Sequence, residues 1–310
     1  MRLIEVVPDH ESRQALAAVL ALPPGNRPAS RAQVESFLQY IETCRLEWRV
    51  WRCRQGNQVT ALLIVLFLPG STALFMLPCL ETPDWLPEDQ RYLVTECVKL
   101  LEDNRLYFLQ ALIEPEAKLK RDLIQRAGFR YITRLLYTQR AVNSSQPQER
   151  QAVKIDWIGY SPETHDAFAQ VLLATYEDSA DCPELSGLRP IEAIIASHKA
   201  AGLFDPALWE MAVIDGTPAA CLLLAPHVFG DLMEIVYLGV VRTYRRQGLG
   251  DALLRRALKQ SREQGSRDIT AVVDERNMAA RQLYARFAFK PTAEREAYLH
   301  LPARTTSNGI

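Results

Sequence analysis

The feature that most constrains the fold is an internal repeat. Predicted elements follow one another in the same order in both halves of the 310-residue chain, and Gly56 and Gly216 stand 160 positions apart. The same spacing relates further pairs, mostly of core type: Leu62 and Leu222, Leu93 and Leu253, Lys99 and Lys259, Ala111 and Ala271, Arg126 and Arg286, Phe129 and Phe289. Because one offset holds over roughly seventy residues without a gap, the repeat predicts two homologous domains, which the chain length also favours.

Each half is predicted to contain a strand, two helices, a hairpin, a strand, a helix, a strand, a helix and a closing strand segment. In the second half the hairpin turns at Asp215-Gly216, a pair typical of two-residue turns. Alternating strands and helices predict the α/β (α+β) fold class. The polar, proline-bearing segment AVNSSQPQERQ is the predicted linker, residues 141–151, between domains at 1–140 and 152–310.

Composition limits the possible partners and the compartment. The chain has 36 basic and 37 acidic residues, so we expect neither a nucleic acid nor a membrane surface as partner. Six cysteines, mostly in apolar runs and without CxxC pairing, predict a reduced, cytoplasmic protein. The longest strongly apolar run, residues 61–68, is too short to span a bilayer, and no signal peptide is expected. The histidines show no ligand spacing, so no metal site is predicted.

The stretch RRQGLG, residues 245–250, joins an apolar strand to an amphipathic helix. The first N–H groups of a helix have no intrahelical partner, and the helix dipole places partial positive charge there. Gly248 and Gly250 would let an anion approach the backbone, and Arg245 and Arg246 would add charged donors. The loop therefore predicts a phosphate site, with a solvated turn carrying surface arginines as the alternative.

Two motifs give this prediction a family context. The segment LGVVRTYRRQGLGDALL resembles the acetyl-CoA signature of the GNAT superfamily of N-acetyltransferases, R/Q-x-x-G-x-G/A. The segment NMAARQLYARFAFK resembles the family's N-x-x-A-x-x-L-Y-x-x-x-G-F element. Arg242 replaces a usual proline and Ala288 a usual glycine. The resemblance is specific over residues 234–290 and extends over 152–301.

The resemblance implies two tandem GNAT-fold domains, each a mixed, mostly antiparallel twisted sheet flanked by helices. It also implies acetyl-CoA as co-substrate, with backbone amides of residues 238–240 serving as oxyanion and pantetheine contacts. Asn277 is in addition a good N-cap for the helix that it begins. The predicted cofactor-binding residues are Leu238, Gly239, Val240, Arg245, Arg246, Gln247, Gly248, Leu249, Gly250, Asp251 and Asn277.

Two residues are predicted to be catalytic. Tyr284 lies two helical turns after Asn277, and the matching tyrosine of the family protonates the departing sulfur; a core aromatic is the alternative. Glu234 is the candidate base, since its apolar surroundings would raise its pKa; a residue facing water is the alternative. Other family members place the base where this chain has Val272, so the nearby Asp274 and Glu275 stay open.

The first half lacks all of these features. Residues 245–250 correspond to WLPEDQ, residues 85–90, with two carboxylates and no glycine. Asn277 corresponds to Ala117 and Tyr284 to Ile124. We therefore predict a degenerate first domain without a cofactor loop; an unrelated helix cap is the alternative.

These features together predict an N-acetyltransferase that moves an acetyl group from acetyl-CoA to a primary amine, of a small molecule, by direct transfer in a ternary complex. The alternative is a non-catalytic acyl-CoA-binding sensor or interaction module, which would need neither Glu234 nor Tyr284. One active and one decayed domain resemble the layout of mycothiol synthase, which implies a cysteinyl-glucosamine-inositol acceptor. Residues 176–190 would line the acceptor cleft, and four carboxylates there suit a cationic amine unless the segment is only a polar surface loop: Glu177, Asp178, Asp181 and Glu184.

Overall fold

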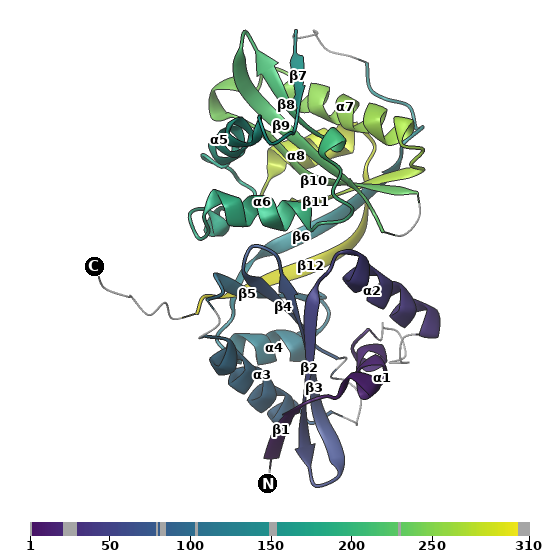
Figure 1. Ribbon diagram of the computed structural model, residues 1–310, viewed down its shortest axis with the longest axis vertical. Helices are drawn as coiled ribbons and strands as arrows, with labels where there is room; N and C mark the ends of the chain where they lie inside the picture. Colours follow the sequence, from purple (N-terminus) through teal and green to yellow (C-terminus); the bar gives the residue numbers. More distant parts are fainter. Residues whose placement is uncertain are drawn as a thin grey trace, which may run out of the picture. The chain divides into compact units, whose positions relative to one another are not determined.

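The protein is described by a computed structural model that covers residues 2–20, 30–78, 80, 85–102, 105–148, 154–228 and 231–302. Its contacts divide the chain into two compact units (Figure 1). Unit 1 comprises Met1–Ile132 with Arg295–Ile310, and unit 2 comprises Thr133–Glu294. This division departs from the predicted limits of 1–140 and 152–310 at the closing strand of each half, because a strand joins the sheet with which it pairs, whatever its place in the sequence. Residues 149–151 of the predicted linker lie outside the described residues.

Unit 1 is a sheet with helices on both faces. Its strands are β1 (Arg2–Val6), β2 (Glu47–Gln55), β3 (Gln58–Leu68), β4 (Thr72–Met76), β5 (Phe108–Ile113) and the end of β12 (Lys290–His300), in the order β1-β2-β3-β4-β5-β12. Its helices are α1 (Asp9–Val19), α2 (Arg31–Thr43), α3 (Pro87–Glu102) and α4 (Lys118–Arg126). Among the described strand pairs of this unit, β4 and β5 are parallel and the others are antiparallel.

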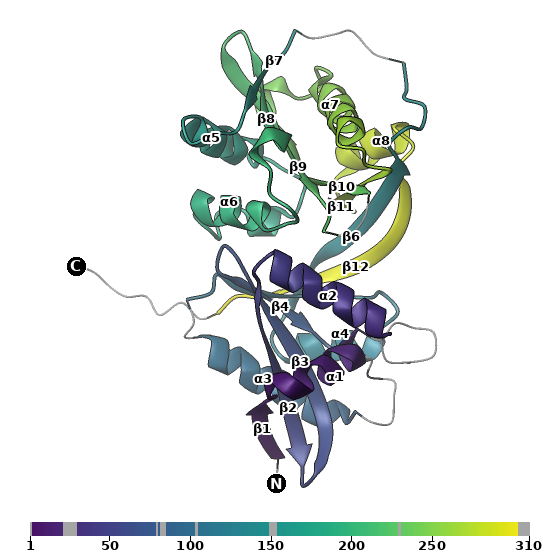
Figure 2. The ribbon, with the colours of Figure 1, turned by 45° about the vertical axis from the view of Figure 1, so that its right-hand side comes forward.

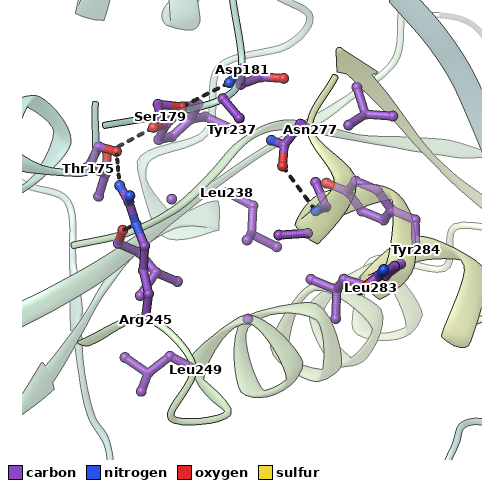
Figure 3. Close-up of a pocket in the computed structure, with 18 of the residues that line it drawn as sticks. Thr175, Ser179, Asp181, Tyr237, Leu238, Arg245, Leu249, Asn277, Leu283 and Tyr284 are labelled. Carbon is purple, nitrogen blue, oxygen red and sulfur yellow. Dashed lines mark hydrogen bonds between the residues drawn. The ribbon is translucent and has the colours of Figure 1, made fainter. Parts of the chain in front are cut away.

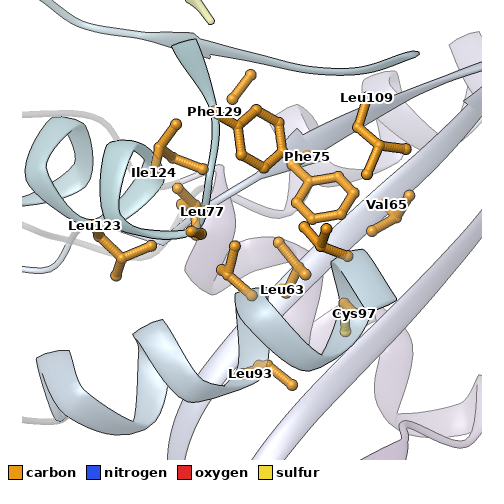
Figure 4. Close-up of a cluster of buried hydrophobic side chains, with 14 of the residues drawn as sticks. Leu63, Val65, Phe75, Leu77, Leu93, Cys97, Leu109, Leu123, Ile124 and Phe129 are labelled. Carbon is orange, nitrogen blue, oxygen red and sulfur yellow. The ribbon is translucent and has the colours of Figure 1, made fainter. Parts of the chain in front are cut away.

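Successive side chains of β3 point to opposite faces of the sheet and contribute to a hydrophobic core on each face. Leu63 and Val65 pack with α3 and α4 around Phe75 and Phe129, as Figure 4 shows. Leu62 and Ile64 point to the other face, where α1 and α2 pack. The nearly continuous apolar run of β3 is therefore that of a strand buried on both faces.

Unit 2 repeats this arrangement. Its strands are β6 (Arg130–Ala141), β7 (Asp156–Gly159), β8 (Trp209–Ile214), β9 (Thr217–Pro226), β10 (Leu232–Val240) and β11 (Asp268–Asp274), in the order β6-β11-β10-β9-β8-β7. Its helices are α5 (His165–Thr175), α6 (Ile191–Lys199), α7 (Leu249–Glu263) and α8 (Met278–Arg286), and α5 and α6 cover the face opposite to α7 and α8 (Figure 2). The predicted turn between β8 and β9 is confirmed, with positive φ at both Asp215 and Gly216.

The register of the strands confirms the repeat. The parallel pairs of β4 and β5 run from Thr72–Phe108 to Phe75–Ala111, and those of β10 and β11 run over residues 232–235 and 268–271, each 160 positions later. Helices α4 and α8 are related by the same offset. The predicted fold class, a mixed α/β architecture built twice, is therefore confirmed. No helix within the described residues has the length and apolarity needed to cross a membrane.

Candidate functional site

A cavity opens in unit 2 where two parallel strands diverge. Strands β10 and β11 pair only as far as Ile235, next to a register shift that ends at Tyr237, whereas β11 continues to Asp274 alongside β6. The rest of β10 therefore has no β11 partner. A cavity of ≈ 680 Å³ lies there, lined by β10, β11, the starts of α7 and α8, and the segment after α5 (Figure 3).

The predicted phosphate loop forms the start of α7 at this cavity. Gly248 is the N-cap residue with φ 88°, in the left-handed region that favours glycine. The backbone N–H groups of Gly248, Leu249 and Gly250 donate to no acceptor within the described part of the chain, and all three residues line the cavity. A Cβ at Gly250 would lie 3.2 Å from Leu283 Cδ2, so this glycine allows α7 to pack against α8. The loop therefore presents unbonded donors to the cavity.

The Arg245 guanidinium is bonded to backbone carbonyls and does not point toward the unbonded N–H groups at the start of α7. It donates hydrogen bonds to the backbone carbonyls of Val240 (3.0 Å), Thr175 (3.0 Å), Glu177 (2.6 Å) and Asp178 (3.0 Å). The arginine thus fixes the segment that follows α5 to the end of β10. A direct contact of its side chain with phosphate, predicted from the sequence, would require giving up these bonds.

The neighbouring loop residues differ in whether their side chains are free to bind a ligand. Arg246 is exposed and has no ion-pair partner among the described residues, whereas the Gln247 amide donates to the Thr243 carbonyl at 2.9 Å. Asp251 lines the cavity, but its carboxylate pairs with Arg255 at 2.9 Å and with Arg286. Its N–H donates to the Gly248 carbonyl. Asp251 therefore links α7 to α8 rather than offering a donor.

The three predicted backbone contacts on β10, Leu238, Gly239 and Val240, all line the cavity. A Cβ at Gly239 would lie 2.5 Å from Tyr237 Cε1 and 2.8 Å from Thr175 Oγ1. The absence of a side chain at Gly239 therefore lets α5 and the Tyr237 ring pack closely against β10. The Tyr237 hydroxyl lies 2.8 Å from Thr175 Oγ1. Tyr237 packs on the face opposite to Leu238, as the strand alternation predicts.

Tyr284 is at once a core residue and a cavity residue. Its side chain is buried, its ring centroid lies 5.1 Å from that of Phe289, and it lines the cavity beside Asn277 (Figure 3). Burial and the charge of Asp181 raise the pKa of Tyr284 well above its ordinary value. Asn277 accepts a hydrogen bond from the Ala280 N–H at 3.1 Å, which confirms its N-cap role.

Glu234 lies on β10 directly before the cavity wall, which begins at Ile235. Met233 and Ile235 pack with the α7 core, so the Glu234 side chain points to the opposite face, where α5 and α6 pack. Glu234 is half-buried, and burial raises its pKa from 4.5 to about 7. This is the shift that the sequence predicts for a general base working near neutral pH.

The alternative base Asp274 is held as a stable carboxylate. Burial disfavours its ionisation, but hydrogen bonds from Arg276 and Thr133 outweigh this effect and lower its pKa to about 2. It also accepts from the Cys182 N–H at 2.9 Å. Asp274 is therefore a weak base that organises the turn before α8, and Glu275 lies half-buried in that turn.

The start of α3 in unit 1, which corresponds to the start of α7, carries buried polar side chains. Asp89 is fully buried and accepts hydrogen bonds from Arg2 (2.5 Å), Gln55 (2.7 Å) and Thr60 (2.6 Å). Gln90 is equally buried, and its side chain bonds both the N–H and the carbonyl of Leu62. The carboxylate predicted to repel a phosphate therefore belongs to a buried network.

No group of three or more His, Cys, Asp or Glu side chains within the described ranges is arranged to hold a metal ion. Sequence reasoning missed the role of Arg245 toward carbonyls, because nothing in a loop motif reveals where its side chain turns. It also missed the hydrogen bonds that Asp274 forms with Thr133, Asp181 and Cys182, which are distant from it in sequence.

Comparisons with known proteins agree with this geometry. A family model described as the acetyltransferase (GNAT) family matches residues 172–289. The structure is similar to a GCN5-related N-acetyltransferase from Sphaerobacter thermophilus, with a TM-score of 0.67 at 18% identity over 100% of this chain and 97% of that chain. It is also similar to a tandem GNAT protein from the clavulanic acid biosynthesis pathway, with a TM-score of 0.55 at 15% identity over 98% and 100% of the two chains.

A third similar structure is a GCN5-related N-acetyltransferase from Kribbella flavida, with a TM-score of 0.54 at 18% identity over 89% of this chain and 96% of that one. A comparison with curated proteins gave no match. The structural likenesses establish the fold, and the family model covers the cavity of unit 2. Residues 172–289 of unit 2 thus match the acetyltransferase (GNAT) family, and the chain as a whole is similar in fold to a tandem GNAT protein.

Proposed function

We propose that unit 2 transfers an acetyl group from acetyl-CoA to a primary amine of a small molecule, directly, in a ternary complex. The observation that carries this proposal is the opening between β10 and β11, which leads to three unbonded N–H groups at the start of α7. Backbone donors at a helix N-terminus suit a diphosphate, and an unpaired strand edge suits a chain of amide groups. The residues present therefore fit acetyl-CoA, which would supply a thioester activated for acyl transfer.

Holding the co-substrate falls to two groups of residues. Gly248, Leu249 and Gly250 offer backbone donors for the diphosphate, and Arg246 adds an exposed positive charge beside them. The free edge of β10, which includes Leu238, supports the pantetheine arm and offers donors to the developing oxyanion. Arg245 acts indirectly, since it fixes the β10 end against the segment after α5.

Two side chains are assigned to proton transfer. An alkylammonium must lose a proton before it can attack, and Glu234, with its pKa near 7, is suited to accept it directly or through water. Tyr284 stays protonated at every working pH, because its pKa lies well above the ordinary value. Its hydroxyl therefore stabilises the leaving sulfur by donating a hydrogen bond and, as negative charge builds up there, a proton.

The test is release of free CoA from acetyl-CoA in the presence of a panel of primary amines: alkylamines, amino sugars and amino alcohols. We expect amine-dependent release by the full-length protein and its loss in a Glu234→Gln, Tyr284→Phe double variant that still binds acetyl-CoA. Tight binding of acetyl-CoA without release for any amine would instead favour the acyl-CoA sensor or interaction module.

A further inference from the structure

The segment between α5 and α6 presents one carboxylate that differs from its neighbours. Three of the four acidic side chains predicted to face an acceptor lie within ion-pair distance of an arginine. Asp178 pairs with Arg242 at 2.6 Å, and Glu177 lies 3.6 Å from the same guanidinium. Glu184 forms a two-bond contact with Arg276, at 2.6 and 2.9 Å. These three therefore serve the segment itself and are poorly suited to bind an external cation.

Asp181 has no ion-pair partner among the described residues and lines the cavity. Its Oδ1 accepts a hydrogen bond from the Asp274 N–H at 3.1 Å, and the Asn277 amide also hydrogen-bonds its carboxylate. Burial and the negative charge of Asp274 raise the pKa of Asp181, and the two hydrogen bonds and the more distant charge of Arg276 only partly offset this. A half-buried carboxylate without a cation gains more from an ammonium ligand than an exposed one does.

The backbone around Asp181 is held from two sides. Arg245 bonds the carbonyls that precede it, and Asp274 accepts from the Cys182 N–H that follows it. Asp178 and Cys182 have φ of 49° and 45°, a conformation that costs energy for residues other than glycine. Such a conformation persists only when its surroundings enforce it, so the segment fixes the position of Asp181 rather than letting it drift toward solvent.

Asp181 also lies at a different end of the cavity from the unbonded N–H groups at the start of α7. Figure 3 shows Asp181 beside Asn277 and across the cavity from Leu249. Asp181 and Tyr284 line the same cavity, and the charge of Asp181 contributes to the raised pKa of Tyr284. One end of the cavity thus suits an anion, and the other carries Asp181, which has no ion-pair partner in the described part of the chain.

We propose that Asp181 binds the ammonium group of the acceptor and makes unit 2 selective for acceptors that are cationic at neutral pH. This inference rests on the proposed function, whose acceptor it specifies. The ammonium would donate a charge-assisted hydrogen bond to the Asp181 carboxylate. Asp274 and Asn277 would keep that carboxylate oriented, and the three arginine-paired acids would not compete for the ligand.

The experiment compares Asp181→Asn with Glu177→Gln, a matched control that removes one exposed carboxylate from the same segment. Saturation-transfer NMR measures the binding of each panel amine to the CoA-loaded protein. The same measurement is made with the matching uncharged alcohol, in which a hydroxyl replaces the amino group. We expect Asp181→Asn to weaken amine binding and raise the amine KM roughly 10- to 100-fold, the scale of a hydrogen bond between charged groups. In Asp181→Asn, alcohol binding and acetyl-CoA affinity should change less than about twofold. In Glu177→Gln, amine binding and the amine KM should also change less than about twofold.

Failure of the two proposals is distinguishable. Amine binding that depends on Asp181, without any CoA release, would contradict acetyl transfer and leave the ammonium site standing. Release of CoA with an unchanged amine KM in Asp181→Asn would overturn the ammonium site and leave acetyl transfer standing. If no amine of the panel binds the CoA-loaded protein and none is acetylated, both proposals are wrong.

Discussion

At Tyr284 one side chain serves both packing and proposed chemistry, and the two roles can be separated. Tyr284→Phe keeps the ring against Phe289 and removes only the hydroxyl. We expect acetyl-CoA affinity and the melting temperature to change little, while kcat falls roughly 10- to 1000-fold, the scale of one acid–base group. Steady-state kinetics with any accepted amine measure this, and an unchanged kcat would leave Tyr284 with a packing role alone.

The pKa of Glu234 leads to a prediction about pH. A base with a pKa of about 7 is ionised only above that pH, so kcat/KM should fall as the pH drops through about 7. In Glu234→Gln most of the rate should be lost together with that limb, and raising the pH should restore part of it as more amine becomes neutral. A pH profile of the glutamine variant that coincides with the wild-type profile would remove Glu234 from the mechanism.

Ionisation of Glu234 should also lower the free energy of unfolding. Its pKa is raised by burial, so its contribution to stability is fully present below about pH 4.5 and is lost as the pH rises through about 7. Glu234→Gln should therefore be more stable than the wild type at pH 8, by on the order of 2 kcal/mol, and about equally stable at pH 5. Thermal denaturation at the two pH values tests this, and equal melting temperatures at pH 8 would contradict it.

At the scale of elements, the start of α7 can be tested with matched glycines. Gly248 and Gly265 both have positive φ, 88° and 73°, and open space where a Cβ would stand. Alanine at either position should destabilise the protein by roughly 1–2 kcal/mol through backbone strain alone. Gly248→Glu should in addition abolish acetyl-CoA binding, since a carboxylate would meet the diphosphate. Calorimetry should find Gly265→Ala unaffected in binding, and a Gly248→Glu variant that still bound acetyl-CoA would move the diphosphate elsewhere.

The segment after α5 and the end of β10 form one element through Arg245. Lysine cannot reproduce the fork of N–H donors that bonds three carbonyls of that segment. We therefore expect Arg245→Lys to raise the amine KM at least as much as the acetyl-CoA KM. An effect confined to acetyl-CoA would return Arg245 to the phosphate contact that the motif predicts.

At the scale of the whole molecule, the two units share a fold and differ in what occupies the start of the helix. Because unit 1 has the buried, hydrogen-bonded Asp89 and Gln90 where unit 2 has Leu249 and Gly250, we expect calorimetry to find one acetyl-CoA per chain. Glu88, which is exposed, should tolerate Glu88→Gln without a change in affinity or stability. Asp89→Ala should cost on the order of 3 kcal/mol, since it strips buried donors of their acceptor. A second acetyl-CoA bound per chain would contradict a degenerate unit 1.

Local patterns were enough to predict the repeat, the fold class and the glycine-bearing turn that begins α7. Gly248 and Asn277 act within one turn of the chain, where residue type and spacing decide the backbone conformation and the cap. The apolar surroundings of Glu234 are also visible in its own strand. Such features depend on neighbours in sequence, so the sequence by itself determined them.

Only the tertiary structure decided which unit receives each closing strand, where the Arg245 guanidinium points and which acid stays unpaired. β12 pairs through residues 296–300 with β5, and Asp181 meets Asp274, which lies 93 positions away. The same type of residue, a surface-loop carboxylate by its sequence, becomes ion-paired at Glu184 and unpaired at Asp181. The physical reason is that charge pairing and burial depend on groups brought together by folding, and their distance in space is not encoded in a local pattern.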